Sequence, residues 1–250
     1  METVPTTLPE RVIHLRDVQK AYHNGREITP VLKQVNLDID RGEFVFLAGP
    51  SGCGKSTLLA ILGAMLTPDS GIVRILGQNL VGLDHEARTL FRRQKVGFIF
   101  QRFHLIRGLS VIENVCVPMA IRGRSSAPSR RAAGDLLAAV GLAGKEAART
   151  HRLSSGQQQR VAIARALIGD PALILADEPT ASLDAKNGQA VVELLRNLVK
   201  QQGKTAVVVT HDRRIFPLAD RICMLENGRL TSDTCESVAT GDHSENLPWV

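Results

Sequence analysis

Residues 49–56 read Gly-Pro-Ser-Gly-Cys-Gly-Lys-Ser and fit the pattern G-x-x-x-x-G-K-[ST]. The apolar run Phe44–Ala48 predicts a buried strand before this loop, and residues 57–65 predict a helix after it. Such glycines let backbone N–H groups turn inward around an anion, and the helix N-terminus adds partial positive charge. We therefore prefer a phosphate site in an α/β fold to a glycine-rich turn with a chance Lys-Ser pair. The residues expected to hold the phosphates are Gly49, Pro50, Ser51, Gly52, Cys53, Gly54, Lys55, Ser56 and Thr57.

Three side chains of this loop have distinct expected roles. Lys55 is expected to reach the β- and γ-phosphates of a nucleotide, and the Ser56 hydroxyl to ligate Mg²⁺. Cys53 is interpreted as a small loop residue, because phosphoryl transfer needs positioning and charge neutralisation more than a protein nucleophile.

A pair of acids follows a second apolar run, Leu173–Ala176. Asp177 ends this predicted strand and is the candidate for holding Mg²⁺ through the water shell of the ion, because Mg²⁺ dehydrates reluctantly. Glu178 is expected to point towards the γ-phosphate, where a carboxylate polarises the attacking water. The alternative is a helix N-cap, since Pro179 and Thr180 come next.

Hydrophobic periodicity divides the chain into three kinds of segment. Short apolar runs typical of parallel strands buried on both faces are Phe44–Ala48, Val96–Phe100, Leu173–Ala176 and Thr205–Thr210. Alternating segments that predict an antiparallel sheet with one wet face are Val12–Val18, Val31–Ile39 and Gly71–Leu76. Between Ser110 and Gly156 the pattern predicts the helices 112–121 and 130–140, separated by a loop at 123–128. The polar stretch Thr231–Val250 is expected to be a loosely attached tail.

Composition limits the class of protein and of partner. The 250 residues are 44% hydrophobic and 22% charged, with a formal net charge of +6, which is typical of a compact domain. No stretch approaches the roughly 20 apolar residues of a membrane-spanning helix, and residues 1–10 lack a secretory signal, so the cytoplasm is expected. One Trp and one Tyr leave little to stack on bases, so no nucleic-acid partner is expected. Cysteines at 53, 116, 223 and 235 lack metal-site spacing and are expected to be reduced.

The segment Leu153–Leu167, which contains Ser154-Ser155-Gly156-Gln157, resembles the signature of ATP-binding cassette (ABC) ATPases. Together with the phosphate loop and the acid pair, the resemblance covers nearly the whole chain. It implies a P-loop NTPase: a RecA-like parallel sheet core with an N-terminal antiparallel β subdomain and an inserted α-helical subdomain at about 102–157. One ATPase domain is expected at 11–232, with flexible tails at 1–10 and 233–250.

The resemblance also implies a head-to-tail dimer with ATP and Mg²⁺. The signature of one copy, Ser154, Ser155, Gly156 and Gln157, closes over the ATP held by the other. The other implied roles are stacking on adenine by Tyr22, contact with Mg²⁺ or water by Gln101, contact with the γ-phosphate by His211, and crossing of the dimer interface by Asp184. Tyr22 as a surface aromatic and His211 as a structural histidine are the alternatives. Ser155 departs from the family, which usually has glycine there, and its side chain either adds a hydroxyl contact or crowds the closure.

The run Phe91–Gln101, followed by Phe103, Leu105, Leu109-Ser110-Val111 and Glu113-Asn114-Val115, resembles the macrolide-export and lipoprotein-release (MacB/LolD) group and its glycolipid-export (DevA) relatives. This implies an ATPase on the inner face of the cell membrane that powers a separate permease, with a periplasmic adaptor in some systems. An amino-acid importer, a cassette acting on nucleic acid or ribosomes, and a small-molecule kinase are the alternatives. The Arg-rich stretches 88–95, 122–131 and 149–152 are interpreted either as solvated surface or as contacts to a permease or anionic lipid.

Overall fold

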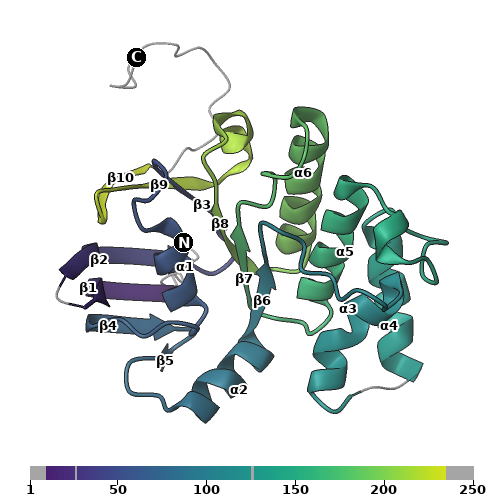
Figure 1. Cartoon of the computed structure of the whole chain (residues 1–250), viewed down its shortest axis with the longest axis horizontal. Helices are drawn as coiled ribbons and strands as arrows, with labels where there is room; N and C mark the ends of the chain where they lie inside the picture. The colour runs from purple at the N-terminus through teal and green to yellow at the C-terminus, as the bar shows by residue number, and fades with distance from the viewer. Residues whose placement is uncertain (1–9, 26, 125–126, 235–250) are drawn as a thin grey trace, which may run out of the picture.

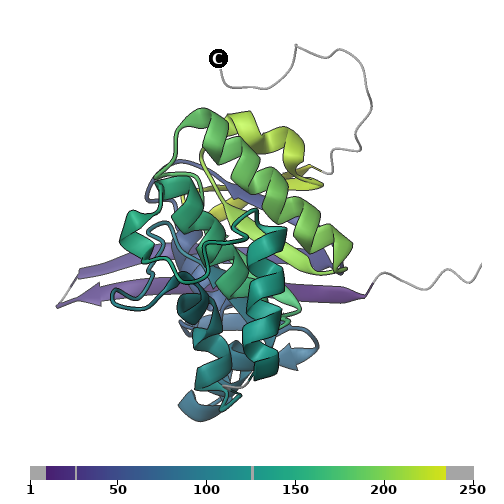
Figure 2. The ribbon, with the colours of Figure 1, turned by 90° about the vertical axis from the view of Figure 1, so that its right-hand side faces the viewer.

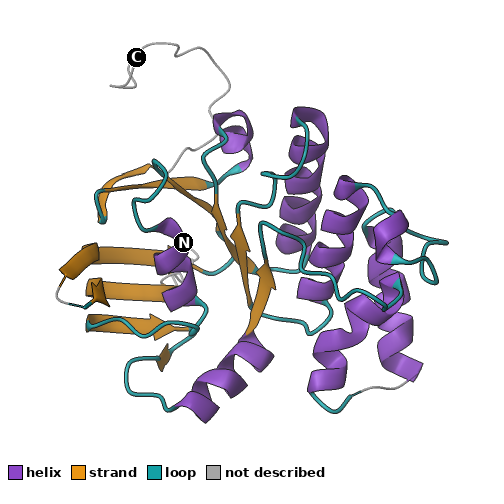
Figure 3. Cartoon of the chain, in the orientation of Figure 1, coloured by secondary structure: helices purple, strands orange, loops and turns teal. Residues whose placement is uncertain are grey.

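The computed structural model describes residues 10–25, 27–124 and 127–234. Its strands form two sheets, and its helices lie mainly on one side of the larger sheet (Figure 1 and Figure 3). The strands of the larger sheet, in spatial order, are β10 (Arg229–Thr234), β9 (Arg221–Glu226), β3 (Phe44–Ala48), β8 (Thr205–Val209), β7 (Leu173–Asp177) and β6 (Val96–Ile99).

The strands β9, β3, β8, β7 and β6 are parallel, while β10 runs antiparallel to β9. Along β3, Phe44 and Phe46 face one hydrophobic core, and Val45 and Leu47 face another. A strand covered on both faces needs apolar side chains at every position, which is why its sequence is a continuous apolar run.

The smaller sheet is antiparallel, and it packs over α1. Its strands, in spatial order, are β2 (Glu27–Asp40), β1 (Arg11–Asn24), β4 (Ser70–Ile75) and β5 (Gln78–Asn79). Leu15 and Leu37 from this sheet share a core with Leu59 of α1 (Lys55–Leu62) and with Leu47 of β3. The helix that follows the phosphate loop therefore lies between the two sheets.

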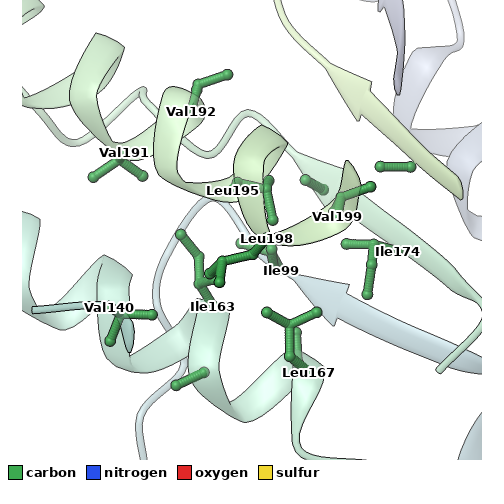
Figure 4. Close-up of a cluster of buried hydrophobic side chains, with 14 of the residues drawn as sticks. Ile99, Val140, Ile163, Leu167, Ile174, Val191, Val192, Leu195, Leu198 and Val199 are labelled. Atoms are coloured by element: carbon green, nitrogen blue, oxygen red, sulfur yellow. The ribbon is translucent and has the colours of Figure 1, made fainter. Parts of the chain in front are cut away.

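The second core lies on the other face of the larger sheet, under four helices (Figure 2). These are α3 (Val111–Ile121), α4 (Ala127–Ala139), α5 (Ser155–Leu167) and α6 (Ala185–Gln201), with 3₁₀ turns at Thr150–Arg152 and Arg213–Leu218. The helix α2 (His85–Lys95) instead buries Phe91 in the first core, with α1 and the smaller sheet. Figure 4 shows Val191, Leu195 and Val199 of α6 against Ile163 of α5 and Ile174 of β7. The spacing of three and four residues on α6 places its apolar side chains on one face.

The predicted strands are present, and in the larger sheet their bounds differ from the prediction by at most one residue. In the smaller sheet, β1 and β2 continue past several register shifts as a long ribbon. The prediction of a tail from Thr231, or from residue 233, is wrong for residues up to Thr234, because these pair with β9. Residues 235–250 of that predicted tail, and residues 1–9 of the N-terminal one, lie outside the described residues.

The predicted loop at 123–128 is also too long, because α4 begins at Ala127. Pro128 lies in the first turn of α4, where a missing N–H costs no intrahelical hydrogen bond. The helix α1 begins at Lys55, two residues earlier than predicted, and it ends at Leu62, where Gly63 forms its C-cap.

Several arginines from the Arg-rich stretches bind the carbonyl ends of neighbouring helices. The last carbonyls of a helix lack intrahelical partners and carry partial negative charge, so guanidinium groups stabilise them. The pairs are Arg92 with Ala64 O after α1 (2.7 Å), Arg93 with Ile121 O at the end of α3, and Arg122 with Gly169 O after α5 (2.7 Å). Arg92 and Arg122 are partly buried in these contacts, while Arg93 remains exposed.

Candidate nucleotide site

The phosphate loop lies between β3 and α1, and two of its glycines are required by their surroundings. Gly49 has φ 146°, and a Cβ there would lie 2.0 Å from the backbone oxygen of Leu225. Gly54 has φ 109°, and its Cβ would lie 3.0 Å from the backbone oxygen of Val31. A side chain at either position would be strained in its backbone and would collide with the neighbouring strand.

Lys55 lies inside this loop. Its side chain is buried, and the Nζ ammonium donates to the carbonyls of Gly49 and Pro50, each at 2.8 Å. Cys53 is also buried, with its Sγ 3.9 Å from Nζ. The cation is thus held at the loop by the loop's own backbone.

Asp177 and Ser56 meet where β7 ends and α1 begins. The Ser56 hydroxyl donates to Asp177 Oδ1 at 3.2 Å. Burial raises the pKa of the Asp177 carboxyl, and the neighbouring charge of Glu178 adds to this rise, while the Ser56 hydrogen bond and Lys55 oppose it. A hydroxyl and a partly buried carboxylate are hard oxygen ligands, so this pair fits Mg²⁺.

We expect Asp177→Asn to stabilise the nucleotide-free protein at neutral pH. A carboxyl whose pKa is raised by folding destabilises the native state as pH rises through that pKa, and the neutral amide removes this cost. Thermal unfolding without nucleotide should show a higher Tm for the variant at pH 8, and the difference should shrink as pH falls below the pKa of an unfolded Asp. The same substitution should abolish the effect of Mg²⁺ on ATP binding. A lower Tm at pH 8 would contradict this account of Asp177.

Glu178 and His211 follow the adjacent parallel strands β7 and β8. The Glu178 N–H donates to Val209 O at 3.0 Å, and Glu178 has φ 44°, which is unusual for a residue with a side chain. Its Oε2 lies 2.9 Å from His211 Nδ1. The alternative of a helix N-cap at the acid pair is wrong, because the next helix, α6, is capped by Asp184.

Ten of the predicted residues line one cavity of about 740 Å³. They are Tyr22, Ser51, Gly52, Gly54, Lys55, Ser56, Thr57, Gln101, Glu178 and His211. Tyr22 is 47% exposed, and its hydroxyl lies 3.5 Å from Thr57 Oγ1. Val31 lines the cavity as well; nothing in the sequence pattern of β2 marked it, and it enters because β2 runs past Gly54.

The four predicted site residues at the start of α5, residues 154–157, do not line this cavity. Ser154 is the N-cap: its Oγ accepts from Gln157 N at 3.3 Å, and Gln157 Oε1 accepts from Ser154 N at 3.2 Å. Ser154 and Ser155 are exposed. A Cβ on Gly156 would meet only Asn187, at 3.8 Å or more, so packing within this chain does not require glycine there.

Asp184 also lies outside the cavity and caps α6. Its Oδ1 accepts from Asn187 N at 2.9 Å, and this hydrogen bond is the largest of the effects that lower the pKa of Asp184. The structure therefore brings the phosphate loop, the acid pair, Gln101 and His211 together, and leaves the α5 start and Asp184 elsewhere on the chain.

The cysteines Cys53, Cys116 and Cys223 are free, while Cys235 lies outside the described residues. Across the described ranges, no group of three or more His, Cys, Asp or Glu side chains has the geometry of a metal site. Within the same ranges, every helix is too short or too polar to cross a bilayer.

Comparisons with known proteins all find ATP-binding proteins of ABC transporters. A profile of the ABC transporter family matches residues 32–181, more than half of the chain. The lipoprotein-releasing system ATP-binding protein LolD 1 of Caulobacter vibrioides is 44% identical over 223 residues, 89% of this chain and 95% of that protein. The macrolide export ATP-binding/permease protein MacB 1 of Yersinia pestis bv. Antiqua is 43% identical over 89% of this chain, which spans only 34% of that protein.

A solved structure agrees. The dimeric post-hydrolysis state of the ATP-binding cassette MJ0796 bound to ADP and Pi has a TM-score of 0.82 and 43% identity, covering 89% of this chain and 98% of that one. The chain belongs to the ABC transporter family. It is an ATP-binding cassette ATPase, and its resemblance to the MacB/LolD group and its α/β fold class are both confirmed.

Proposed function

We propose that two copies of this chain pair head to tail, with each ATP held between the phosphate loop of one copy and the α5 start of the other. One observation carries the proposal: ten predicted site residues line a single cavity, whereas the exposed α5 start lies outside it. A helix N-terminus with exposed hydroxyls is suited to an anion. Packing within this chain does not require the glycine, which supports a contact of Gly156 with another molecule.

The cavity residues divide the work of hydrolysis. Tyr22 stacks on the base, and Lys55 neutralises the β- and γ-phosphates. Ser56, Asp177 and Gln101 hold Mg²⁺, which when bound neutralises charge on the phosphate oxygens. Glu178 polarises the attacking water.

His211 lies against the Glu178 carboxylate, where it orients that group and contacts the γ-phosphate. The unusual backbone of Glu178, tied to β8 through Val209, fixes where the carboxylate points.

We further propose that the closing dimer drives a separate membrane permease in export or in lipid extraction, from a position on the inner face of the cell membrane. The supporting facts are the names of the relatives, a lipoprotein-releasing ATP-binding protein and a macrolide export ATP-binding/permease protein. This chain spans 95% of the former protein and 34% of the latter. A periplasmic adaptor, reached through the permease, is part of the same proposal.

The transport half of the proposal is tested by purification from membranes. An affinity-tagged chain, extracted in mild detergent, should bring down a polytopic membrane protein identified by mass spectrometry, and that complex should hydrolyse ATP faster than the isolated chain. Recovery with ribosomes or nucleic acid instead, without a membrane protein, would contradict it. A Lys55→Ala chain should still bring down the permease, which separates docking from nucleotide binding.

A further inference from the structure

The segment 101–110 carries Gln101 and joins β6 to α3 without helix or strand. Its second half is held by Asn114, a fully buried side chain on α3. Asn114 Oδ1 accepts from Ile106 N at 2.7 Å, and its Nδ2 donates to Ser110 O at 3.0 Å. Residues 106–110 are therefore fixed to α3.

The first half of the segment is held from a different helix. Arg165, in the last turn of α5, donates through Nη1 to His104 O at 2.6 Å and through Nη2 to Phe103 O at 2.7 Å. These are charge-assisted hydrogen bonds to two consecutive carbonyls, which the planar fork of guanidinium matches and a lysine ammonium does not. The Arg165 side chain is partly buried, and this burial lowers the pKa of its guanidinium.

The two ends of α5 thus lie in different surroundings. Its N-terminus is the Ser154-Ser155-Gly156 surface, and Arg165 lies ten residues further along, about 15 Å of helix. His104, whose carbonyl accepts from Arg165, has φ 45°. Its ring packs edge-on against the ring of Phe100, the residue before Gln101, with centroids 5.0 Å apart. Arg165 and His104 therefore connect α5 to the backbone next to Gln101.

We propose that Arg165 is a positioning residue, which sets Gln101 relative to α5 and so ties the chain's own nucleotide cavity to the surface it presents to a second copy. This rests on the role proposed above for Gln101 in hydrolysis. Arg165 does not line the nucleotide cavity, so it acts through the 101–104 backbone and not on ATP itself.

The test is a double-mutant cycle between Arg165→Lys and Gln101→Ala, read as kcat and as KM for ATP. Arg165→Lys alone should lower kcat roughly tenfold with KM within about twofold, because the cavity residues are untouched. In the Gln101→Ala background the same change should have no further effect on kcat. Arg160→Lys is the matched control, since Arg160 is also on α5 but binds the carbonyl of Val140, at 3.2 Å, after α4.

Equal losses of kcat from Arg165→Lys with and without Gln101→Ala would overturn the inference and leave Gln101 in its proposed role. An unchanged kcat in Gln101→Ala alone would remove that role, and the inference with it. Melting temperatures of all variants identify any loss of folded protein. If Arg165→Lys unfolds, Arg165→Gln, which keeps a single planar NH2 group as donor, takes its place in the cycle.

Discussion

Glu178→Gln is expected to bind Mg·ATP and to hydrolyse it roughly 10²- to 10⁴-fold more slowly than the unchanged protein, the usual cost of losing a positioned base. The amide keeps the shape of the side chain but loses the charge that polarises water. The Glu178 N–H to Val209 O bond at the end of β7 is a backbone contact and survives the substitution. Single-turnover hydrolysis of labelled ATP measures the loss without interference from product release.

The control for this variant is Glu193→Gln on α6, where the carboxylate accepts from Gln189 Nε2 at 2.9 Å and lies outside the nucleotide cavity. It should keep normal turnover. Near-normal turnover in Glu178→Gln would take Glu178 out of the reaction.

Two inactive variants are expected to restore each other when mixed. Lys55→Ala removes the cation from the phosphate loop, and Gly156→Asp puts a carboxylate where the partner's γ-phosphate is proposed to bind. Each alone should lose roughly 10²-fold or more of its turnover, as expected when a preorganised charge is removed or opposed. In a mixed dimer, one site combines both defects and the other has neither. An equal mixture should therefore recover about a quarter of the normal activity, the share of intact sites after random pairing.

Gly156→Asp is expected to fold normally. The space around Gly156 admits a Cβ, with Asn187 no closer than 3.8 Å, and a negative charge in the first turn of α5 is favourable to the helix. ATP binding to the Gly156→Asp chain alone should be unchanged, which verifies its own phosphate loop. A mixture no more active than its separate parts would contradict a site shared between chains.

The sequence predicts the larger sheet well because each of its central strands has cover on both faces. In β8 every side chain is buried, and the four residues after Thr205 are all apolar. The acid pair is predictable for the same reason, because Asp177 and Glu178 follow the last fully buried residue of β7, where the need for apolar side chains ends.

Other features depend on contacts that no local pattern records. β10 reads as a polar tail because it is an edge strand with mostly exposed side chains, and its pairing with β9 is made by the backbone. The use of Arg92, Arg93 and Arg122 on helix ends needs the helices to be placed first. Val31 joins the cavity only through the packing of β2 against the loop.

The site shared between two copies can be predicted neither from local patterns nor from the contacts within one chain. Motifs in a single chain do not state which of them meet within that chain. The structure separates the cavity residues from the α5 start, and this separation is what turns a collection of motifs into a testable claim about two copies.

The most direct test of that claim is the mass in solution of the Glu178→Gln variant, measured by sedimentation equilibrium. With Mg·ATP, we predict twice the 27.1 kDa of one chain, and with ADP or no nucleotide, the mass of a single chain. Adding Gly156→Asp to the same variant should return the ATP-bound protein to 27.1 kDa. Saturation with ATP at an unchanged mass of 27.1 kDa in the Glu178→Gln variant would contradict the proposal that nucleotide is held between two copies.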